Sequence, residues 1–274
     1  MLPEKNKLVY DLAMSVLDGA ELKITRTSGF SERIIEVPRA AYWLKKFAGK
    51  EGCDIMDIGY TMSSLDWLGL LLKLNERDNC TICAKDIVKP ERVKSRYPQE
   101  WLDAIFEILV EIGDIREMQL PENQFDVVTC ISTIEHIGFD EAEEDDKSTA
   151  FKRSKDENEA RITRSPDVNE QVLAQFNKAL KTGGHAIITT PMGKGGPALL
   201  KDSLGLFTRQ WEYEADSWND LASQPGFEIV EESFFGLEKD GIWYQVNSPE
   251  DLKEKSSELQ PHAHGCAFVV LKKV

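Results

Sequence analysis

The chain has 274 residues, of which 41% are hydrophobic and 9% aromatic, enough for a packed core and too many for an intrinsically disordered protein. Its 33 basic and 48 acidic residues give a net charge of −15, which disfavours general attraction to nucleic-acid phosphates or anionic lipid surfaces. We therefore expect neither a nucleic-acid nor a membrane partner. No segment reaches the ~20 consecutive apolar residues of a membrane span, and we expect no signal peptide.

Cysteine and histidine usage favours a reducing, cytoplasmic compartment and no metal. The five cysteines are odd in number and lie in or beside apolar runs, which predicts free thiols. Cys80 and Cys83 form a Cys-x-x-Cys motif, but no second pair follows at zinc spacing. His262 and His264, close to Cys266, have no third ligand nearby, so we interpret them as loop or pocket-lining residues.

Two helices are expected before the first strand. Apolar residues at helical spacing predict one over residues 4–18, and Pro38 is expected to open the second, which Gly49 stops. We predict that residues 1–50 form a helical arm or cap and that residues 51–274 form the main domain.

From residue 53 onward, strands alternate with helices. Apolar runs predict strands over 53–58, 81–87, 108–112, 125–131, 186–190, 227–235 and 266–272. Helices are predicted after Ser63 and Ser64, over 101–105 and 171–180, and up to Leu221. This alternation predicts an α/β fold with a doubly wound, mostly parallel sheet and helices on both faces. The last two strands are expected to pair antiparallel at one edge.

One segment interrupts the alternation. Residues 140–167, after the fourth strand, begin with six acidic residues in seven positions. We interpret this segment as a solvated acidic insertion.

Polar residues follow the ends of successive strands, where ligands bind in open parallel sheets. Asp57 and Gly59 follow the first strand, and Gly59 permits a tight turn there. Asp86 ends the second strand, and the two oxygens of a carboxylate match the two hydroxyls of a ribose. Asp114 precedes the fourth strand, where it can accept a hydrogen bond from an exocyclic amine, and residues 132–137 follow that strand.

Several motifs, taken in this order, resemble those of class I S-adenosylmethionine-dependent methyltransferases. They are Gly113-Asp114-Ile115-Arg116, Leu120-Pro121, Phe125-Asp126-Val127-Val128, Glu135-His136, Leu180-Lys181-Thr182-Gly183-Gly184 and Gly226-Phe227. The resemblance covers residues 53–272 apart from the acidic insertion. It implies a Rossmann-like fold, S-adenosylmethionine as cofactor, and methyl transfer to a small-molecule or glycan acceptor at a hydroxyl group.

The resemblance also implies a set of site residues. Those expected to bind S-adenosylmethionine are Asp57, Gly59, Tyr60, Ser63, Asp86, Ile87, Asp114, Ile115 and Ser132. His136 is the candidate general base, because an imidazole titrates near neutral pH, and Glu135 is the candidate that orients it. A structural role for His136, capping a helix or bonding backbone, is the alternative.

The first turn departs from the family pattern. Members usually read Asp-hydrophobic-Gly-x-Gly-x-Gly, whereas Thr61 and Ser63 stand here in place of the later glycines. Either the hydroxyl residues are tolerated and Ser63 or Ser64 bonds the cofactor carboxylate, or cofactor binding is lost and the domain is a relic that acts as a binding module. A nucleotide-dependent oxidoreductase is a third reading, but its Gly-x-Gly-x-x-Gly motif is missing.

Two further features allow a functional and a structural reading. Residues 31–38, Ser-Glu-Arg-Ile-Ile-Glu-Val-Pro, resemble a Glu-Arg-x-x-Glu-x-Pro arm of bacterial methyltransferases from polysaccharide or secondary-metabolite clusters. The structural alternative is a helix entry whose Arg33 and Glu36 pair at the surface. Four aromatic residues either stack on an acceptor or pack in the core, namely Trp211, Trp218, Trp243 and Tyr244.

Overall fold

The computed structural model describes residues 2–24, 26–48, 52–77, 79–91, 97, 102, 108–139, 163–202 and 205–274. Within these residues the strands are β1 (Asp54–Ile58), β2 (Thr81–Asp86), β3 (Val110–Ile112), β4 (Phe125–Ile131), β5 (Leu180–Pro191), β6 (Gly196–Lys201), β7 (Phe207–Glu212), β8 (Phe227–Leu237), β9 (Trp243–Val246) and β10 (Gly265–Lys273). Eight of them form one sheet in the order β3-β2-β1-β4-β5-β10-β8-β9, and β6 pairs with β7 in a separate hairpin.

The sheet is parallel in its first half and antiparallel in its second. Strands β3, β2, β1, β4 and β5 are parallel neighbours. Strand β10 runs antiparallel to both β5 and β8, and β9 is antiparallel to β8. The antiparallel pairing of the last two predicted strands is therefore confirmed, but its expected position is wrong, because β9 rather than β8 or β10 forms that edge.

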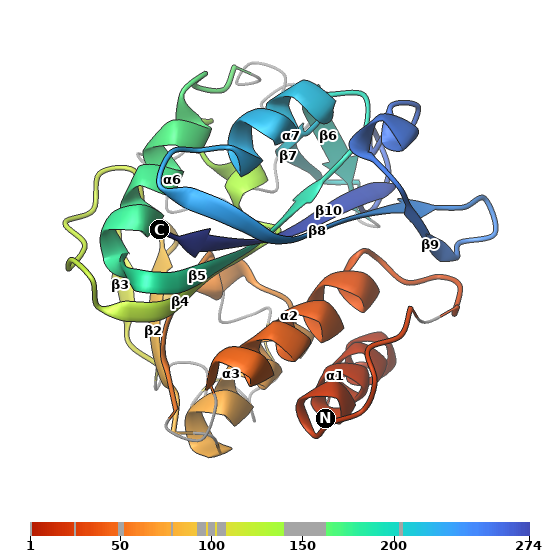
Figure 1. The fold of residues 1–274 in the computed structure, drawn as a ribbon. Coiled ribbons are helices and arrows are strands. Elements are labelled where there is room, and N and C mark those ends of the chain that lie inside the picture. Colours follow the sequence, from red (N-terminus) through yellow and green to blue (C-terminus); the bar gives the residue numbers. More distant parts are fainter. Residues whose placement is uncertain are drawn as a thin grey trace.

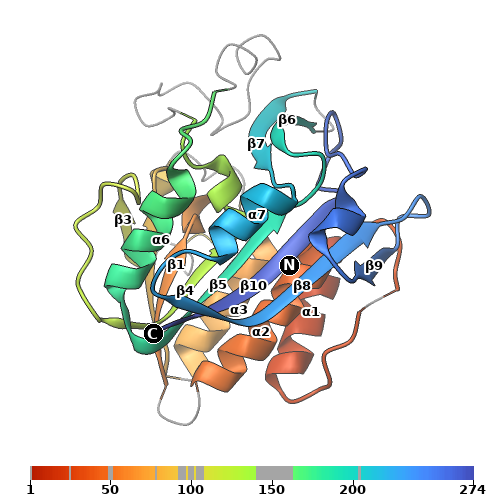
Figure 2. The same ribbon diagram turned by 45° about the horizontal axis from the view of Figure 1, so that its top comes forward.

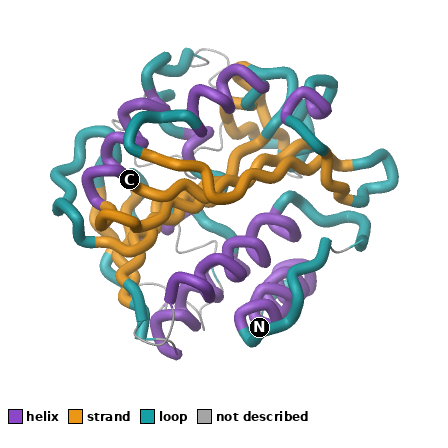
Figure 3. The backbone as a smooth tube through the Cα atoms, viewed as in Figure 1, coloured by secondary structure: helices purple, strands orange, loops and turns teal. Residues whose placement is uncertain are grey.

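Helices cover both faces of the sheet, as predicted (Figures 1 and 3). The described helices are α1 (Glu4–Leu17), α2 (Arg33–Ala48), α3 (Leu65–Arg77), α6 (Val168–Ala179) and α7 (Ala215–Ala222), with 3-10 turns η1 (Tyr60–Met62), η3 (Ile134–His136) and η4 (Pro249–Leu252). Helices α1, α2 and α3 pack on one face, and α6 and α7 on the other. Side chains of β4 alternate between the two cores, with Val127 facing the first and Val128 the second.

The start of α2 differs from the prediction. The helix begins at Arg33, and Pro38 lies inside it rather than at its first position. The Ser31 hydroxyl accepts a hydrogen bond from the Arg33 N–H (3.4 Å), and the Glu32 carbonyl accepts from the Ile35 N–H (2.8 Å), so the first turn is closed upstream of the proline. Pro38 then costs the helix one backbone hydrogen bond without ending it.

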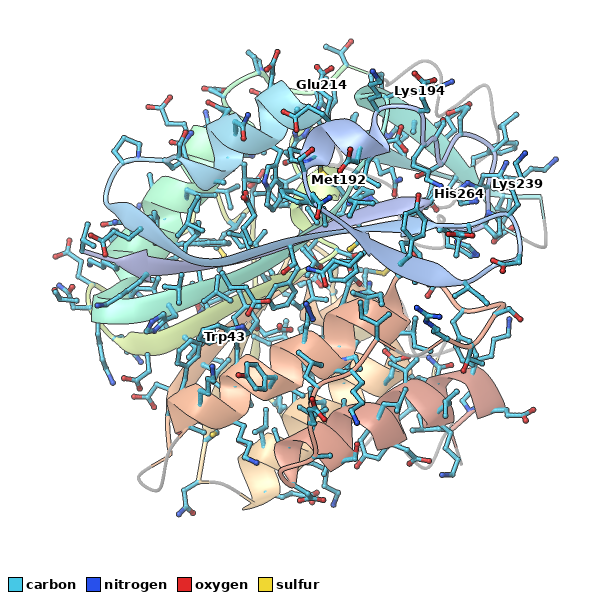
Figure 4. All side chains as sticks on the ribbon, turned by 45° about the vertical axis from the view of Figure 1, so that its right-hand side comes forward. Trp43, Met192, Lys194, Glu214, Lys239 and His264 are labelled. Atoms are coloured by element: carbon cyan, nitrogen blue, oxygen red, sulfur yellow. The ribbon has the colours of Figure 1, made fainter. Side chains whose placement is uncertain are left out.

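The N-terminal helices share the core of the sheet. Residues of α1, α2, α3 and β1 belong to one continuous buried cluster. Trp43 projects from α2 toward the sheet, where its Nε1 donates to the Glu231 carboxylate of β8 over 2.6 Å (Figure 4). The division into an arm of residues 1–50 and a domain of residues 51–274 stays a prediction.

Two expected segments fall largely outside the described residues. These are the predicted helix at 101–105 and most of the acidic insertion at 140–167. None of the described helices has the length and apolar character needed to cross a membrane. The five cysteines are free thiols.

Candidate active site

A cavity of about 230 Å³ opens at the carboxyl ends of the parallel strands. Its walls come from the turn after β1, the end of β2, residues 113–116 after β3 and residues 132–139 after β4. Arg33 of α2 and Thr208 of β7 complete the wall. The cavity therefore lies where strand order reverses, between β1 and β4, the position expected for a ligand in a doubly wound sheet.

The structure brings most of the predicted site residues together at this cavity. Those that line it are Gly59, Ser63, Asp86, Ile87, Asp114, Ile115, Ser132 and His136. Asp57, Tyr60 and Glu135 are buried and do not line it, so they have no direct surface for a ligand.

The turn after β1 is built without the usual glycines. Gly59 has φ +86°, and a Cβ there would lie 2.3 Å from the Thr133 Oγ1, so this position needs glycine for both reasons. The following 3-10 turn η1 directs the Thr61 N–H to Oδ2 of Asp86 (2.8 Å), and the Ser63 hydroxyl donates to the Gly59 carbonyl (3.0 Å). The hydroxyl of Ser63 thus closes the turn.

The prediction that Ser63 or Ser64 caps α3 is wrong, because Asp66 accepts the backbone hydrogen bond in the first turn of this helix. The Ser64 hydroxyl donates to Asp66, and it is the Asp66 Oδ1 that accepts the Trp67 N–H (2.9 Å). An aspartate in the first turn can accept backbone hydrogen bonds and also complements the helix dipole.

Asp86 is buried at the end of β2 and keeps acceptor capacity toward the cavity. Its Oδ2 accepts from Thr61 and its Oδ1 accepts the Val88 N–H (2.7 Å). The Met62 N–H also donates to this carboxylate, which leaves part of its acceptor capacity for a ligand at the cavity wall. Burial raises the pKa of Asp86 to about 6, with the backbone hydrogen bonds opposing that rise.

Asp57 lies behind the cavity wall and supports it. Its Oδ1 accepts from Trp67 Nε1 (3.1 Å) and Thr129 Oγ1 (2.6 Å), which join α3 and β4 to β1. Its Oδ2 is buried and has no hydrogen-bond partner among the described residues. Burial raises the pKa of Asp57 to about 7.

Asp114 lines the cavity, but a neighbouring guanidinium engages its carboxylate. Nε of Arg116 donates to Oδ1 (3.0 Å) and Nη2 donates to Oδ2 (2.6 Å), a bidentate pair. A ligand amine must share these oxygens, and Ile115 lies beside them in the same wall.

His136 is held by a backbone carbonyl of the β6–β7 hairpin. Its Nδ1 lies 2.6 Å from the Arg209 carbonyl oxygen. A carbonyl can only accept, so Nδ1 carries the proton and Nε2 is the acceptor nitrogen. Burial lowers the pKa of His136 to about 4, so the ring is neutral at pH 7.

Glu135 does not orient His136 through a hydrogen bond. Its Oε1 lies 3.9 Å from Nε2 of His136, beyond hydrogen-bond distance. The side chain is buried, and burial raises the pKa of Glu135 well above its ordinary value. The Arg209 carbonyl takes the orienting position instead.

Arg33 and Glu36 pair as expected, but in the interior and not at the surface. Nη1 of Arg33 lies 3.2 Å from Oε2 of Glu36, whose side chain is fully buried. Oε1 of Glu36 accepts from the Ser132 hydroxyl (2.8 Å), and Ser132 itself has φ +44°. The surface interpretation of this pair was therefore wrong.

Residues 68–155 match the family model of a methyltransferase domain. This match is consistent with a class I S-adenosylmethionine-dependent methyltransferase, the family that the sequence motifs resemble. The match supports a methyltransferase enzyme over the nucleotide-dependent oxidoreductase that the sequence left open. The matched range begins inside α3, so it does not include the glycine-poor turn after β1.

Solved structures with a similar fold are distant in sequence. A methyltransferase of Methanosarcina mazei is 11% identical, with 85% of this chain and 97% of that chain covered and a TM-score of 0.49. The 1,6-didemethyltoxoflavin-N1-methyltransferase of Burkholderia thailandensis, bound to its substrate and S-adenosylhomocysteine, is 14% identical, with 100% and 92% covered and a TM-score of 0.49. An Archaeoglobus fulgidus methyltransferase is 14% identical, with 89% and 95% covered and a TM-score of 0.49. None of the curated proteins matches the chain by sequence.

The cavity of the methyltransferase fits its cofactor in chemistry. The carboxylate of Asp86 can accept hydrogen bonds from a ribose diol, and the tight turn at Gly59 permits close approach of a ligand to the backbone. Arg33 and Ser132 lie by the end of β4 and offer polar partners for a charged amino-acid group.

The lining residues that sequence reasoning did not assign to the site include Lys85, Phe139 and Thr208. Lys85 precedes Asp86 in β2 and pairs with Glu111 (2.5 Å), and Phe139 lies just beyond the recognised Glu-His motif. Thr208 comes from the β6–β7 hairpin, which the sequence analysis did not predict. The β-forming residues of β7 around Thr208 could have indicated this strand.

Proposed function

We propose that the protein transfers a methyl group to a hydroxyl of a small-molecule or glycan acceptor, with His136 as general base. The observation that supports this most is the hydrogen bond from His136 Nδ1 to the Arg209 carbonyl, which leaves Nε2 as the acceptor nitrogen. A neutral imidazole with a fixed tautomer is the form that can take a proton from a hydroxyl.

The cofactor supplies a methyl group already activated by its sulfonium, so placing the acceptor is the main task of the chain. We assign the ribose hydroxyls to Asp86, and the adenine amine to Asp114 together with the Ile115 backbone. Gly59 and Ser63 shape the turn against the cofactor. Ile87 and Ser132 contribute wall surface, and the buried Asp57, Tyr60 and Glu135 support that wall from behind.

The acceptor enters beside His136, between residues after β4 and the β6–β7 hairpin. Ile137 and Phe139 give this part of the cavity apolar walls, and Thr208 adds a hydroxyl. Figure 2 shows the hairpin standing beyond the end of β5. A mixed apolar and hydroxyl lining suits a sugar ring or a similar small polyol better than a strongly charged group.

The N-terminal segment of residues 1–50 acts as a cap on this domain. Its helix α2 contributes Arg33 to the cavity wall, and its partner Glu36 reaches Ser132 in the segment after β4. The cap is therefore part of the cofactor site in this proposal.

The acceptor class is tested with matched pairs of glycosides and amino-glycosides, each incubated with S-adenosylmethionine while S-adenosylhomocysteine release is measured. We expect turnover with the hydroxyl member of a pair and loss of turnover in His136→Gln. His185→Gln is the matched control, because this histidine stacks on Phe47 outside the cavity. Methylation of the amines alone, or an active His136→Gln, would contradict the proposal.

A further inference from the structure

The first turn of α2 reaches the cavity beside the end of β4, two strands along the sheet from Asp86 at the end of β2. Among the described residues, three cationic side chains line the cavity: Arg33, Lys85 and Arg116. Lys85 stands beside Asp86 in β2 and is paired with Glu111, and Arg116 holds Asp114. These two therefore lie with the carboxylates proposed for the adenosine, and Arg33 is the described lining cation beside β4.

Arg33 is held between Glu36 of its own helix and the end of β4. Its Nη1 contacts both the Glu36 carboxylate (3.2 Å) and the Ile131 carbonyl (3.4 Å). One nitrogen thus makes both contacts, and a guanidinium carries five N–H donors in a planar fork. The side chain is 18% exposed, and it lines the cavity together with Gly59 and Ser63 of the turn after β1.

The surroundings of Arg33 suit an anionic ligand group. Glu32, Glu36 and Glu135 all act on it electrostatically, but none of the three lines the cavity. Glu36 and Glu135 are almost completely buried, and Oε2 of Glu36 lies 3.2 Å from Nη1 of Arg33. A guanidinium that lines the wall while its carboxylate partners lie behind it can bind an anionic group of a ligand.

The turn after β1 gives a second reason to look for such a group here. Its Thr61 N–H is bonded to Asp86, so this donor is not directed at a cofactor carboxylate. The Ser63 hydroxyl is likewise bonded within the turn. The carboxylate of the cofactor therefore needs a partner from another part of the chain.

We propose that Arg33 binds the carboxylate of the amino-acid end of S-adenosylmethionine, and that Glu36 positions Arg33 and Ser132 for this contact. The inference rests on the cofactor assignment made above and adds a residue from the N-terminal cap to the cofactor site. An anionic group on the acceptor is the competing occupant of Arg33, and the test separates the two.

The test compares three ligands by isothermal titration calorimetry. S-adenosylmethionine carries the carboxylate, decarboxylated S-adenosylmethionine lacks only that group, and 5′-methylthioadenosine lacks the whole amino-acid end. We expect the wild-type protein to prefer S-adenosylmethionine over the decarboxylated compound at least tenfold, which is about 1.4 kcal/mol. Arg33→Met should reduce this preference to less than threefold and leave the affinity for 5′-methylthioadenosine within threefold of wild type.

Two further variants control for charge and for folding. Arg39→Met removes another arginine of α2 that pairs with a carboxylate, Glu231, outside the cavity, and should keep the wild-type preference. Arg33→Lys keeps the charge without the planar fork and should give an intermediate preference, which also tests the idea if Arg33→Met does not fold. Glu36→Gln should weaken S-adenosylmethionine binding less than Arg33→Met does.

The outcomes separate this inference from the cofactor assignment. If the wild-type protein binds none of the three ligands, the cofactor assignment fails. If it binds them and either shows no preference or keeps its preference in Arg33→Met, the role of Arg33 is refuted while the assignment stands. A variant that binds cofactor normally but shows a raised KM for the acceptor alone would assign Arg33 to the acceptor instead.

Discussion

Replacing Asp86 by alanine separates its ligand contact from its structural contacts. The structural contacts include the backbone N–H groups of Thr61 and Val88, bonded at 2.8 and 2.7 Å, and that of Met62. An unsatisfied buried donor costs about 1–3 kcal/mol, and water from the cavity can reach this position, so we expect a stability loss of about 2 kcal/mol. The lost ribose contacts should weaken cofactor binding at least tenfold, or about 1.4 kcal/mol.

The pH dependence of binding provides the sharper readout. Burial raises the pKa of Asp86 to about 6, and only the ionised carboxylate can accept both hydroxyls. The Kd for S-adenosylhomocysteine should therefore rise as the pH falls through about 6 in the wild-type protein, and this dependence should be absent in Asp86→Asn. Calorimetry between pH 5 and 8 measures it, with Asp216→Ala, an exposed acid of α7, as the control for loss of one charge. An unchanged Kd in Asp86→Ala would refute the ribose assignment.

Three further predictions follow from the geometry of the site. His136→Gln should lower kcat about 100-fold and leave the Kd for S-adenosylhomocysteine nearly unchanged. Because burial lowers the pKa of His136 to about 4, the wild-type kcat should not change with pH near 6.5. A change of kcat in that pH range would contradict a neutral ring. Gly59→Ala should lower the free energy of unfolding by about 3 kcal/mol in urea denaturation, because its Cβ would clash with Thr133. Gly183→Ala is the control, because Gly183 has a similar φ with open space around it, and should lower that free energy by about 1 kcal/mol. Equal losses in the two variants would assign the whole effect to φ. Burial raises the pKa of Asp57 from 3.8 to about 7, so the folded state binds the proton more tightly and stability falls as the pH rises from about 4 to about 7. Thermal melts should show a weaker dependence of Tm on pH in Asp57→Asn than in the wild-type protein. An unchanged dependence would assign the titration to another group.

The core of the fold could be predicted because its strands are buried on both faces. Strands such as β4 then read as continuous apolar runs, and the helices between them show helical spacing. The hairpin of β6 and β7 was missed because Gly196 and Pro197 open β6 and look like a loop. A two-stranded hairpin outside the main sheet tolerates both residues, since it leaves one side of each strand unpaired.

The candidate site could be predicted in part for a similar reason. Asp86 and His136 were found because carboxyl ends of parallel strands meet at one edge. Position at a strand end does not fix the direction of the side chain, however. Asp57 is directed at Trp67 and Thr129 inside the protein, so it lies behind the wall although it belongs to the same edge. Burial of Arg33 was also beyond the local pattern, because it depends on residues about 100 positions away in the chain.

The glycine-poor turn after β1 offers few hydrogen-bond donors to a ligand, and the N-terminal cap supplies a donor, Arg33, to the same cavity. In this chain the turn after β1 uses the Thr61 N–H and the Ser63 hydroxyl for its own closure, so it offers fewer donors to a ligand than an open glycine loop would. Helix α2 brings Arg33 to the same cavity, and Asn6 of α1 donates to Asp66 at the start of α3 (2.6 Å). The segment before the first strand is therefore joined to the cavity by partly buried polar contacts as well as by the shared core. A first turn with few glycines and few free donors is compatible with cofactor binding if a guanidinium from another element supplies the missing donors. In this chain α2 places Arg33 at the cavity wall, where it can do so.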